Sequence, residues 1–414
     1  MVPNEWSAKP LADIVKEKIS YGIVQAGPHV PDGIPYIKSS DVRGTINPYT
    51  LQRTSQEIHF KYRRSSVHPG DIVFSLRGNI GESAIVPASL PEANLTQGTA
   101  RISVSAEHSN LFHYYQLASD NILNRINTLS KGSTFKEISL EELRKVKVLC
   151  APLPEQNKIA KILSTWDKAI TTTEQLLANS QQQKKALMQQ LLTGKKRLLD
   201  KNGVRFSGEW KSFPLHKMAE VIVSPVDKKT ELNEVPVELC NYTDVYYNHQ
   251  ITRNITFMKA SATKSEIAKY TLLQGDVIIT KDSETPGDIA VPALVSEDLK
   301  GVVCGYHLAI VRPNIEFLNG AFLNYLFSMQ STRYYFFTLA TGATRFGLSV
   351  GGINRARFRV PEVAEQQKIA AVLSIADQGI AALQQKLDAL KQEKKALMQQ
   401  LLTGKRRVKV EEAA

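Results

Sequence analysis

Three short stretches in the first half of the chain carry side chains that suit contact with DNA. Arg77-Gly78-Asn79 combines a guanidinium, which can donate two hydrogen bonds to guanine, with an amide suited to adenine. Lys38-Ser39-Ser40 places a charge and two hydroxyls before a turn, and Gly132-Ser133-Thr134 offers small residues that let the backbone approach a phosphate. The alternative for each stretch is an ordinary polar hairpin tip or, at Gly132, the end of a helix. The predicted DNA contacts of this half are Lys38, Ser39, Ser40, Arg77, Asn79, Lys131, Ser133 and Thr134.

Equivalent stretches with different side chains occur in the second half. Asn241-Tyr242 stands at the place of Lys38-Ser39. Lys281-Asp282-Ser283-Glu284 replaces the stretch at Arg77, is longer and acidic, and could accept hydrogen bonds from the amino group of cytosine. Phosphate contacts would position such a protein, and only a few side chains would specify bases. The predicted DNA contacts of this half are Asn241, Tyr242, Lys281, Asp282, Ser283, Thr344 and Arg345.

These paired stretches belong to an internal repeat. The segment KKALMQQLLTGK occurs at Lys184–Lys195 and again, 210 residues later, at Lys394–Lys405. Glu155-Gln156 recurs as Glu365-Gln366 at the same separation, with no gap between the two matches. A repeat of this kind decides the architecture before any single element does. The chain is therefore predicted to contain two copies of one unit, each a variable domain followed by a long helix.

Each copy ends in a helix with a coiled-coil seam. Seam residues recur at alternating steps of four and three over 159–191 and over 369–401, which is typical of a coiled coil rather than a core helix. Gly194 and Gly404 follow the last turns, where a left-handed residue ends a helix. At 1.5 Å per residue, each helix is roughly 58 Å long.

Two long helices in one chain leave two arrangements open. They could form a self-contained antiparallel hairpin that only spaces two domains, or a hairpin that also recruits helices of partner chains. Large side chains and many glutamines near both seams offer more surface than one partner would cover. The predicted subunit-interface residues are Trp166, Leu187, Met188, Leu191, Leu397, Met398 and Leu401.

The composition bounds the class of protein. A chain of 414 residues is too long for one ordinary core, and a hydrophobic content of 43% is typical of a globular protein. A net charge of +12 indicates a polyanionic partner. No run reaches the ~18 apolar residues that span a membrane, the N-terminus lacks the layout of a signal peptide, and three scattered cysteines fit a reducing cytosol. We therefore expect a cytoplasmic protein without membrane contact.

The predicted fold class is α+β, with two variable α/β domains separated by two long antiparallel coiled-coil helices in a pseudo-twofold repeat. The predicted boundaries are 1–151 for the first domain, 152–197 for the first helix, 198–360 for a linker and the second domain, 361–407 for the second helix and 408–414 for a tail. In the first domain we expect strands at 71–76, 83–86, 100–104 and 145–149, a helix at 110–129 and a short helix capped by Ser139. In the second domain we expect strands at 276–280, 288–291, 308–311 and 357–360 and a helix at about 316–339.

Motifs for catalysis are absent from the sequence. There is no G-x-x-x-x-G-K-[ST] loop for ATP phosphates and no Gly-rich fingerprint after a strand for a nucleotide or methyl donor. There is also no Asn/Asp-Pro-Pro-aromatic tetrapeptide, which amino-methylating DNA enzymes use to hold the target nitrogen. The eight histidines show no metal-ligand spacing. We therefore predict no catalytic residue, no metal ligand and no cofactor in this chain.

The chain resembles the specificity subunit of type I restriction–modification systems. The resemblance is carried by P-x-x-E-Q-x-K-I-A from Pro152, by KKALMQQLLTGK from Lys184, by the second copies at Glu365 and Lys394, and by FSGEW ending at Trp210. It covers essentially the whole chain, and the doubled helix motif is highly specific. The second copy departs in one respect, because Pro361 stands one residue further from Glu365 than Pro152 does from Glu155.

The resemblance implies a set of functions and partners. Two target-recognition domains would each read one half of a split sequence in double-stranded DNA, and the antiparallel helices would set the gap between the halves. Two methylation subunits would dock on the chain and hold S-adenosylmethionine, while two restriction subunits would use ATP and Mg. The alternatives are a noncatalytic coiled-coil scaffold with incidental basic charge and, against the missing motifs, a self-sufficient nuclease or methyltransferase.

Overall fold

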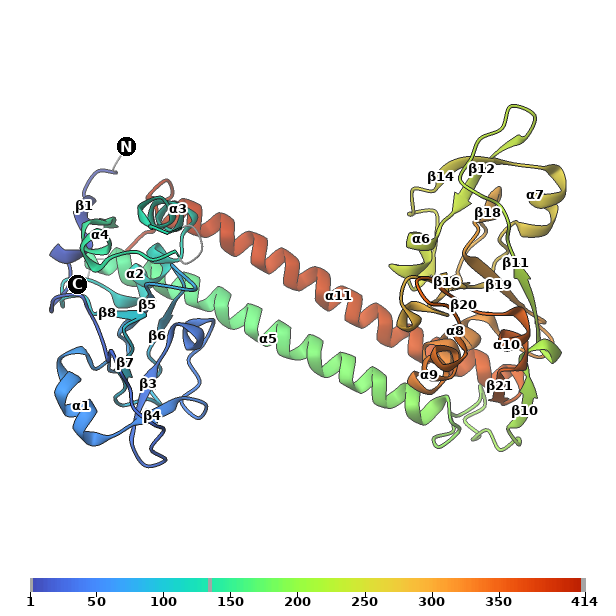
Figure 1. Ribbon diagram of the computed structural model, residues 1–414, viewed down its shortest axis with the longest axis horizontal. Coiled ribbons are helices and arrows are strands. Elements are labelled where there is room, and N and C mark those ends of the chain that lie inside the picture. The colour runs from blue at the N-terminus through green and yellow to red at the C-terminus, as the bar shows by residue number, and fades with distance from the viewer. Residues whose placement is uncertain (1–2, 133–135, 411–414) are drawn as a thin grey trace. The chain divides into compact units, whose positions relative to one another are not determined.

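The computed structural model describes residues 3–132 and 136–410, which divide into two compact units. One unit is formed by the chain up to Gln175 together with the chain from Gln385 onward, and the other by Leu176–Gln384. Each unit contains one mixed α/β domain and parts of two long helices (Figure 1). Within the described residues, no helix is both long and apolar enough to cross a membrane.

The first domain is built on two small sheets. A four-stranded sheet has the order β2 (Ser20–Tyr21), β8 (Thr99–Ile102), β5 (Ile72–Ser75) and β6 (Ser83–Ile85). A three-stranded sheet has the order β4 (Gln52–Thr54), β3 (Ile34–Ile37) and β7 (Asn94–Leu95), and β1 (Ser7–Pro10) pairs with β9 (Lys147–Cys150). The helices are α1 (Gln56–Tyr62), α2 (Asn110–Leu117), α3 (Asp120–Leu129) and α4 (Leu140–Lys145). β5 is buried along its whole length because sheet and helices cover both of its faces.

The second domain repeats this plan with longer strands. Its main sheet has the order β11 (Ala219–Val223), β19 (Leu308–Pro313), β15 (Val277–Thr280), β17 (Pro292–Val295) and β13 (Gln250–Ile251). A three-stranded sheet has the order β14 (Met258–Ala262), β12 (Val235–Cys240) and β18 (Val302–Cys304). Two two-stranded sheets pair β10 (Lys211–Pro214) with β21 (Arg357–Val360) and β16 (Asp282–Ser283) with β20 (Phe346–Gly347). The helices are α6 (Tyr242–Tyr246), α7 (Lys264–Tyr270), α8 (Gly320–Ser328), α9 (Gln330–Leu339) and α10 (Val350–Arg355).

Three predicted elements differ from the structure. The single helices expected at 110–129 and 316–339 are each two helices, because Ser119 and Met329 adopt extended backbone angles (ψ 145° and 140°) that interrupt the helical ladder. The strand expected at 288–291 lies further on, at 292–295. Ala290 has a left-handed φ of 55°, which a continuous strand does not accommodate.

The two long helices confirm the coiled-coil seam. Helix α5 spans Leu153–Leu191 and helix α11 spans Val363–Leu401, each 39 residues long, and both ends differ by the repeat distance of 210. In the middle of α5, Thr173 and Leu177 are buried and Ile170 and Ser180 are partly buried, while the residues between them are exposed. This alternation follows the predicted steps of four and three.

Ion pairs within each unit fix the relative direction of the two helices. In the first unit Asp167 of α5 pairs with Lys394 of α11. Glu174 lies further along α5 and pairs with Lys391, which lies further back along α11. Pairing positions that move in opposite directions along the sequence require antiparallel helices. In the second unit Asp377 pairs with Lys184 in the same way.

The last turn of each long helix lies in a core that it shares with the other repeat's domain. Leu401 and Leu402, at the end of α11, pack in a cluster with Trp6, Phe112 and Ile159 of the first domain and α5. In the second unit, the end of α5 occupies the equivalent place. The corresponding cluster there contains Leu191, Leu192, Trp210, Phe322 and Ile369. Each fully buried leucine contributes about 1.5–3 kcal/mol relative to an exposed one, so these turns anchor the helices to the domains.

Candidate nucleic-acid interface

In the first unit, three of the predicted stretches meet at one end of the four-stranded sheet. A short 3-10 helix spans Ser39–Val42, and the Ser39 hydroxyl donates to the carbonyl of Gly98 over 2.9 Å. The Asn79 side-chain amide donates to the Ser39 carbonyl over 3.4 Å and accepts from the Arg43 guanidinium over 2.7 Å. Ser39, Ser40 and Asn79 therefore belong to one surface, although they are separated by up to forty residues in the chain.

Arg77 is held at the edge of this surface by a carboxylate. Its Nη2 lies 3.2 Å from Glu137 Oε1, and 42% of its side chain is exposed. The Lys131 backbone N–H donates to the Glu137 carbonyl over 2.9 Å, which brings the exposed Lys131 to the same edge. Ser133 and Thr134 lie outside the described residues. Apart from those two, the first-half candidates lie on or beside one surface in the structure.

The second unit builds an equivalent surface from the equivalent stretches. The Asn241 backbone N–H donates to Asp244 over 2.8 Å at the start of α6, and the Tyr242 hydroxyl lies 3.1 Å from the Ser283 hydroxyl. Strand β16 pairs with β20, with Ser283 opposite Phe346, so the exposed Thr344 and Arg345 follow the same edge. We call these two groups of side chains the first and the second recognition surface.

Asp282 is less available to a base than the sequence suggested. Its two carboxylate oxygens are already engaged by Lys281 Nζ at 2.8 Å and His307 Nδ1 at 3.2 Å. Burial opposes ionisation of Asp282, but these hydrogen bonds outweigh it and lower the pKa of the carboxyl group. A cytosine amino group would have to compete with both partners.

Sequence reasoning missed Tyr306 and His307. In the first unit Thr96, Gln97 and Gly98 connect β7 to β8, and in the second unit Gly305, Tyr306 and His307 connect β18 to β19, so His307 takes the place of Gly98. His307 has a left-handed φ of 73°, a strained conformation for a residue with a Cβ. Its ring contacts that of Tyr306, which is 40% exposed. Aligning the two halves strand by strand places Tyr306 and His307 opposite Gln97 and Gly98, in connections of equal length.

The helix motif places a lysine in each seam for a specific contact. In the first unit Asp167 accepts from the Tyr115 hydroxyl and from Lys394 Nζ, each over 2.5 Å. In the second unit Asp377 accepts from the Tyr325 hydroxyl over 2.7 Å and from Lys184. Burial first, and the hydrogen bond to the aspartate second, raise the pKa of both tyrosines. These two triads bind each recognition domain to the opposite helix.

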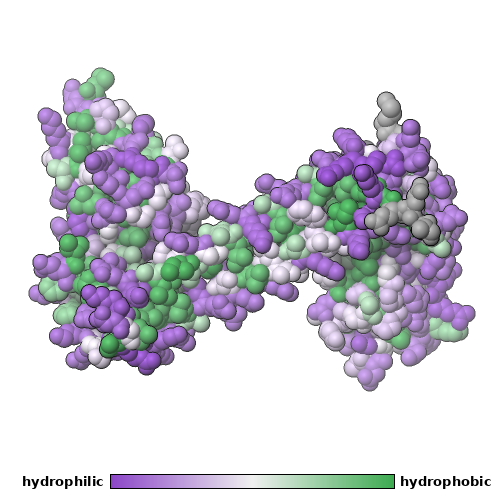
Figure 2. Space-filling model, turned by 180° about the vertical axis from the view of Figure 1, so that it is seen from behind, coloured by the Kyte–Doolittle hydropathy of each residue, from purple (hydrophilic) through white to green (hydrophobic). Residues whose placement is uncertain are grey.

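The predicted subunit-interface residues divide into two groups. Trp166, Leu187, Met188, Leu397 and Met398 are partly buried, whereas Leu191 and Leu401 are buried in the cores and leave no exposed surface for a partner. Leu176 and Ile375 are exposed apolar side chains on the outside of the long helices, at 50% and 67%. The face in Figure 2 is largely hydrophilic, with several groups of hydrophobic side chains among the polar ones.

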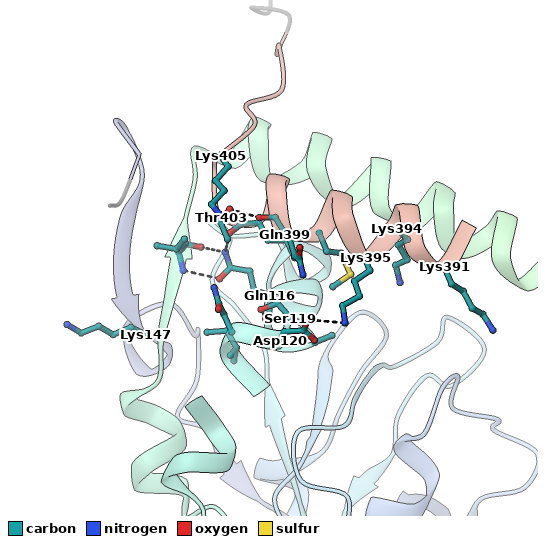
Figure 3. A pocket seen from close by; sticks show the side chains of 16 residues that line it. Gln116, Ser119, Asp120, Lys147, Lys391, Lys394, Lys395, Gln399, Thr403 and Lys405 are labelled. Carbon is teal, nitrogen blue, oxygen red and sulfur yellow. Dashed lines mark hydrogen bonds and ion pairs between the residues drawn. The ribbon is translucent and has the colours of Figure 1, made fainter. Parts of the chain in front are cut away.

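A basic hollow of about 500 Å³ lies beside the end of α11 in the first unit (Figure 3). Lys391, Lys394, Lys395 and Lys405 line one side, and Lys395 Nζ lies 3.2 Å from Asp120 on the other. Five lysines line the hollow, including Lys147. Three of them, Lys391, Lys394 and Lys395, pair with Glu174, Asp167 and Asp120, so a smaller excess of positive charge remains. This excess suits a phosphate or an acidic side chain.

Comparison with known proteins identifies the class. A family model described as the type I restriction modification DNA specificity domain matches residues 3–179 and again 207–392. Because these matches cover well over half of the chain, the protein belongs to that family. Its two units each contain one such domain, which supports the predicted specificity subunit over a coiled-coil scaffold.

Individual relatives are similar at low identity. The chain is 29% identical over 165 residues to the type I restriction enzyme EcoBI specificity subunit of Escherichia coli, a match that spans 39% of this chain and 35% of that protein. It is 21% identical to the type I restriction enzyme MjaVIII specificity subunit of Methanocaldococcus jannaschii, across 99% and 94% of the two chains. The crystal structure of an S subunit from M. genitalium has the same fold, with a TM-score of 0.59, 14% identity and 97% coverage of both chains.

Proposed function

We propose that this chain gives a type I restriction–modification complex its DNA sequence specificity. Each recognition surface reads one half of a split target, and the helix pair sets the gap and docks the methylation subunits. The observation that carries this proposal is the repeat itself. The two units share one arrangement of strands and helices, and each gathers equivalent loops on one surface, yet the loops carry different side chains.

The differences between the two surfaces suit a target with unlike halves. The first surface offers Lys38, Arg77 and Asn79, which are donors for guanine and adenine edges. The second offers Tyr242 and the Lys281–Asp282–His307 group, with more aromatic area and a carboxylate. A repeated protein with identical surfaces would read a palindrome, whereas these surfaces read two different short sequences.

The long helices supply the spacing. A continuous helix of 39 residues extends roughly 58 Å, and at about 3.4 Å per base pair this length corresponds to about 17 base pairs. That reach accommodates two short recognised sequences and a gap between them. The partly buried Trp166 and Leu397 line a hollow near the start of α5, and with Met188 and Met398 they would dock the two methylation subunits.

The chemistry is proposed to reside on the partners. The recognition surfaces consist of hydrogen-bonded amides, hydroxyls and ion pairs, which select a ligand without an activated nucleophile. Adenine methylation with S-adenosylmethionine would belong to the methylation subunits, and ATP- and Mg-dependent translocation and cleavage to two restriction subunits.

The test is to co-express the chain with its methylation subunits and select bound duplexes from a random DNA pool. The expected result is one split motif, with two unlike specified parts and a gap of constant length. Recovery of unrelated duplexes at every salt concentration would contradict the proposal and favour the scaffold. A palindromic motif would contradict the assignment of different bases to the two surfaces.

Replacing Arg77 by Ala is expected to weaken binding to the selected duplex by roughly 10–100-fold and to relax the sequence preference in one half only. The physical reason is the loss of a bidentate contact to guanine, which is worth about 1–3 kcal/mol. The measurement is the dissociation constant at fixed salt, with single-base substitutions in each half.

Glu137→Gln is the matched control for Arg77→Ala. It removes the ion-pair partner of Arg77 but keeps the guanidinium, so binding should be retained or strengthened. Equal dissociation constants for Arg77→Ala and the native chain would make Arg77 an ordinary hairpin side chain.

A further inference from the structure

Two histidines and a cysteine meet where the first recognition domain joins α5. His108 lies in the turn before α2, His113 lies on α2, and Cys150 ends β9. One ligand atom of each residue lies within 4.8 Å of the others, and His113 Nε2 is 3.4 Å from His108 Nδ1. No metal-ligand spacing joins the three residues in the sequence, because only the fold brings the end of β9 beside α2.

The cluster is buried and incompletely hydrogen-bonded. His113 is fully buried and Cys150 is 5% exposed, while His108 is only partly buried and opens the cluster to solvent. Among the described residues, His113 Nδ1 meets no hydrogen-bond partner. A buried imidazole nitrogen without a partner is costly in an apolar interior. The other ring nitrogen, His113 Nε2, faces His108 Nδ1, which the Gln156 side-chain amide also contacts over 3.3 Å.

The second repeat shows that this joint does not require polar residues. The positions 210 residues further on are Leu318, Leu323 and Val360, all buried in the apolar core of the second unit. The surrounding backbone is the same in both units. The Ser109 backbone N–H, directly after His108, donates to the Gln156 side chain, and the Asn319 backbone N–H, directly after Leu318, donates to the Gln366 side chain. The first unit therefore differs from an apolar joint in all three positions at once.

We propose that His108, His113 and Cys150 bind one zinc ion in the first unit. Two imidazole nitrogens and one thiolate form a ligand set that zinc prefers, and solvent reaching the partly buried His108 would fill the fourth position. On binding, the Cys150 thiol releases its proton to solvent and the sulfur forms a bond to the metal, while both imidazoles bind in their neutral form. No redox change is involved.

Burial keeps His113 unprotonated at neutral pH and keeps Cys150 as a thiol. Burial, with a smaller effect from His108, lowers the pKa of His113 to about 3, so this imidazole keeps a free lone pair at neutral pH. Burial raises the pKa of the Cys150 thiol, so the thiolate forms only when the metal takes the place of the proton. The bound ion would tie β9, α2 and the preceding turn together beside the first turn of α5.

The experiment uses the full chain without an affinity tag, in which Co²⁺ replaces zinc as a spectroscopic probe. The expected result is one equivalent of cobalt with a thiolate-to-cobalt charge-transfer absorption, and about one zinc per chain by plasma mass spectrometry after expression with zinc. Zinc should also raise the thermal unfolding temperature of the chain, and a chelator should reverse that shift.

The matched variant is His108→Leu/His113→Leu/Cys150→Val, which introduces the second repeat's own residues and is therefore expected to fold. It should lose the absorption, the bound zinc and the zinc-dependent shift. Cys304→Ala, a change in the second unit, should keep all three. Circular dichroism checks that both variants are folded.

Three outcomes would overturn the proposal. In the first, the native chain holds no more zinc than the triple variant. In the second, cobalt binds but gives no thiolate absorption. In the third, the absorption persists in the triple variant. The first excludes a site, the second places the ion on surface histidines, and the third assigns it to another cysteine. None of these outcomes bears on DNA specificity.

Discussion

Inserting one heptad into each long helix is expected to abolish binding to the original DNA target and to create binding to a target with a longer gap. Duplicating 172–178 in α5 and 382–388 in α11 lengthens both helices by about 10.5 Å, which corresponds to about three base pairs. The insertion preserves the seam, because seven residues restore the alternation of four and three. Affinity for the original target should fall toward nonspecific binding, by about 10³-fold or more.

The measurement is selection from a random DNA pool, followed by dissociation constants on duplexes that differ only in gap length. The control replaces the same two segments by a different heptad with the same seam pattern, without changing their length. That variant should keep the original gap. An unchanged gap in the lengthened protein would contradict the proposal that the helices set the spacing.

Replacing Arg197 by Ala is expected to lower the free energy of unfolding by about 3 kcal/mol, the lower end of the range for breaking a buried ion pair. Arg197 Nε and Nη2 donate to the two oxygens of Glu365 over 2.6 and 2.7 Å, and Glu365 is fully buried. The substitution leaves that carboxylate buried without its guanidinium. Because 20% of the Arg197 side chain is exposed, water would reduce part of the loss.

The repeat provides the matched control for this change. Arg407 donates to Glu155 in the first unit, where the Trp6 indole also donates to that carboxylate over 3.0 Å. Among the described residues, the Trp210 indole meets no acceptor. Arg407→Ala should therefore destabilise the chain less than Arg197→Ala, as measured by urea unfolding, with allowance for separate transitions of the two units.

A second substitution tests the cause of the Arg197 effect. Adding Glu365→Gln to Arg197→Ala should recover part of the lost stability, since a buried amide costs less than a buried carboxylate. Equal losses for the Arg197 and Arg407 variants, or no recovery in the double variant, would show that the guanidinium is not what stabilises Glu365.

The repeat and the seam could be predicted because both are patterns in the sequence itself. Identical residues 210 apart and steps of four and three need no knowledge of tertiary contacts. The meeting of Ser39 and Asn79 on one surface was not predicted, because it depends on how two different sheets pack. The contact of Tyr242 with Ser283 is likewise seen only in the structure.

Features that depend on backbone conformation or on distant contacts were not predictable in this way. The breaks at Ser119 and Met329 fall between two amphipathic helices, so the helical pattern reads as continuous. The left-handed backbone conformation of His307 cannot be recognised from the residue pattern of the strand that follows it. His113 and Cys150 carry no recognisable spacing and become neighbours only through the pairing of β9 with β1 and its packing on α2.

The discontinuous first unit has a consequence for synthesis on the ribosome. The chain up to Gln175 emerges first, yet its core includes Leu401 and Leu402 from the last helix. The second unit is contiguous in sequence and can complete its own core earlier, because Leu191, Leu192 and Trp210 are followed directly by the rest of that domain. The domain that is translated first is thus the last to be finished.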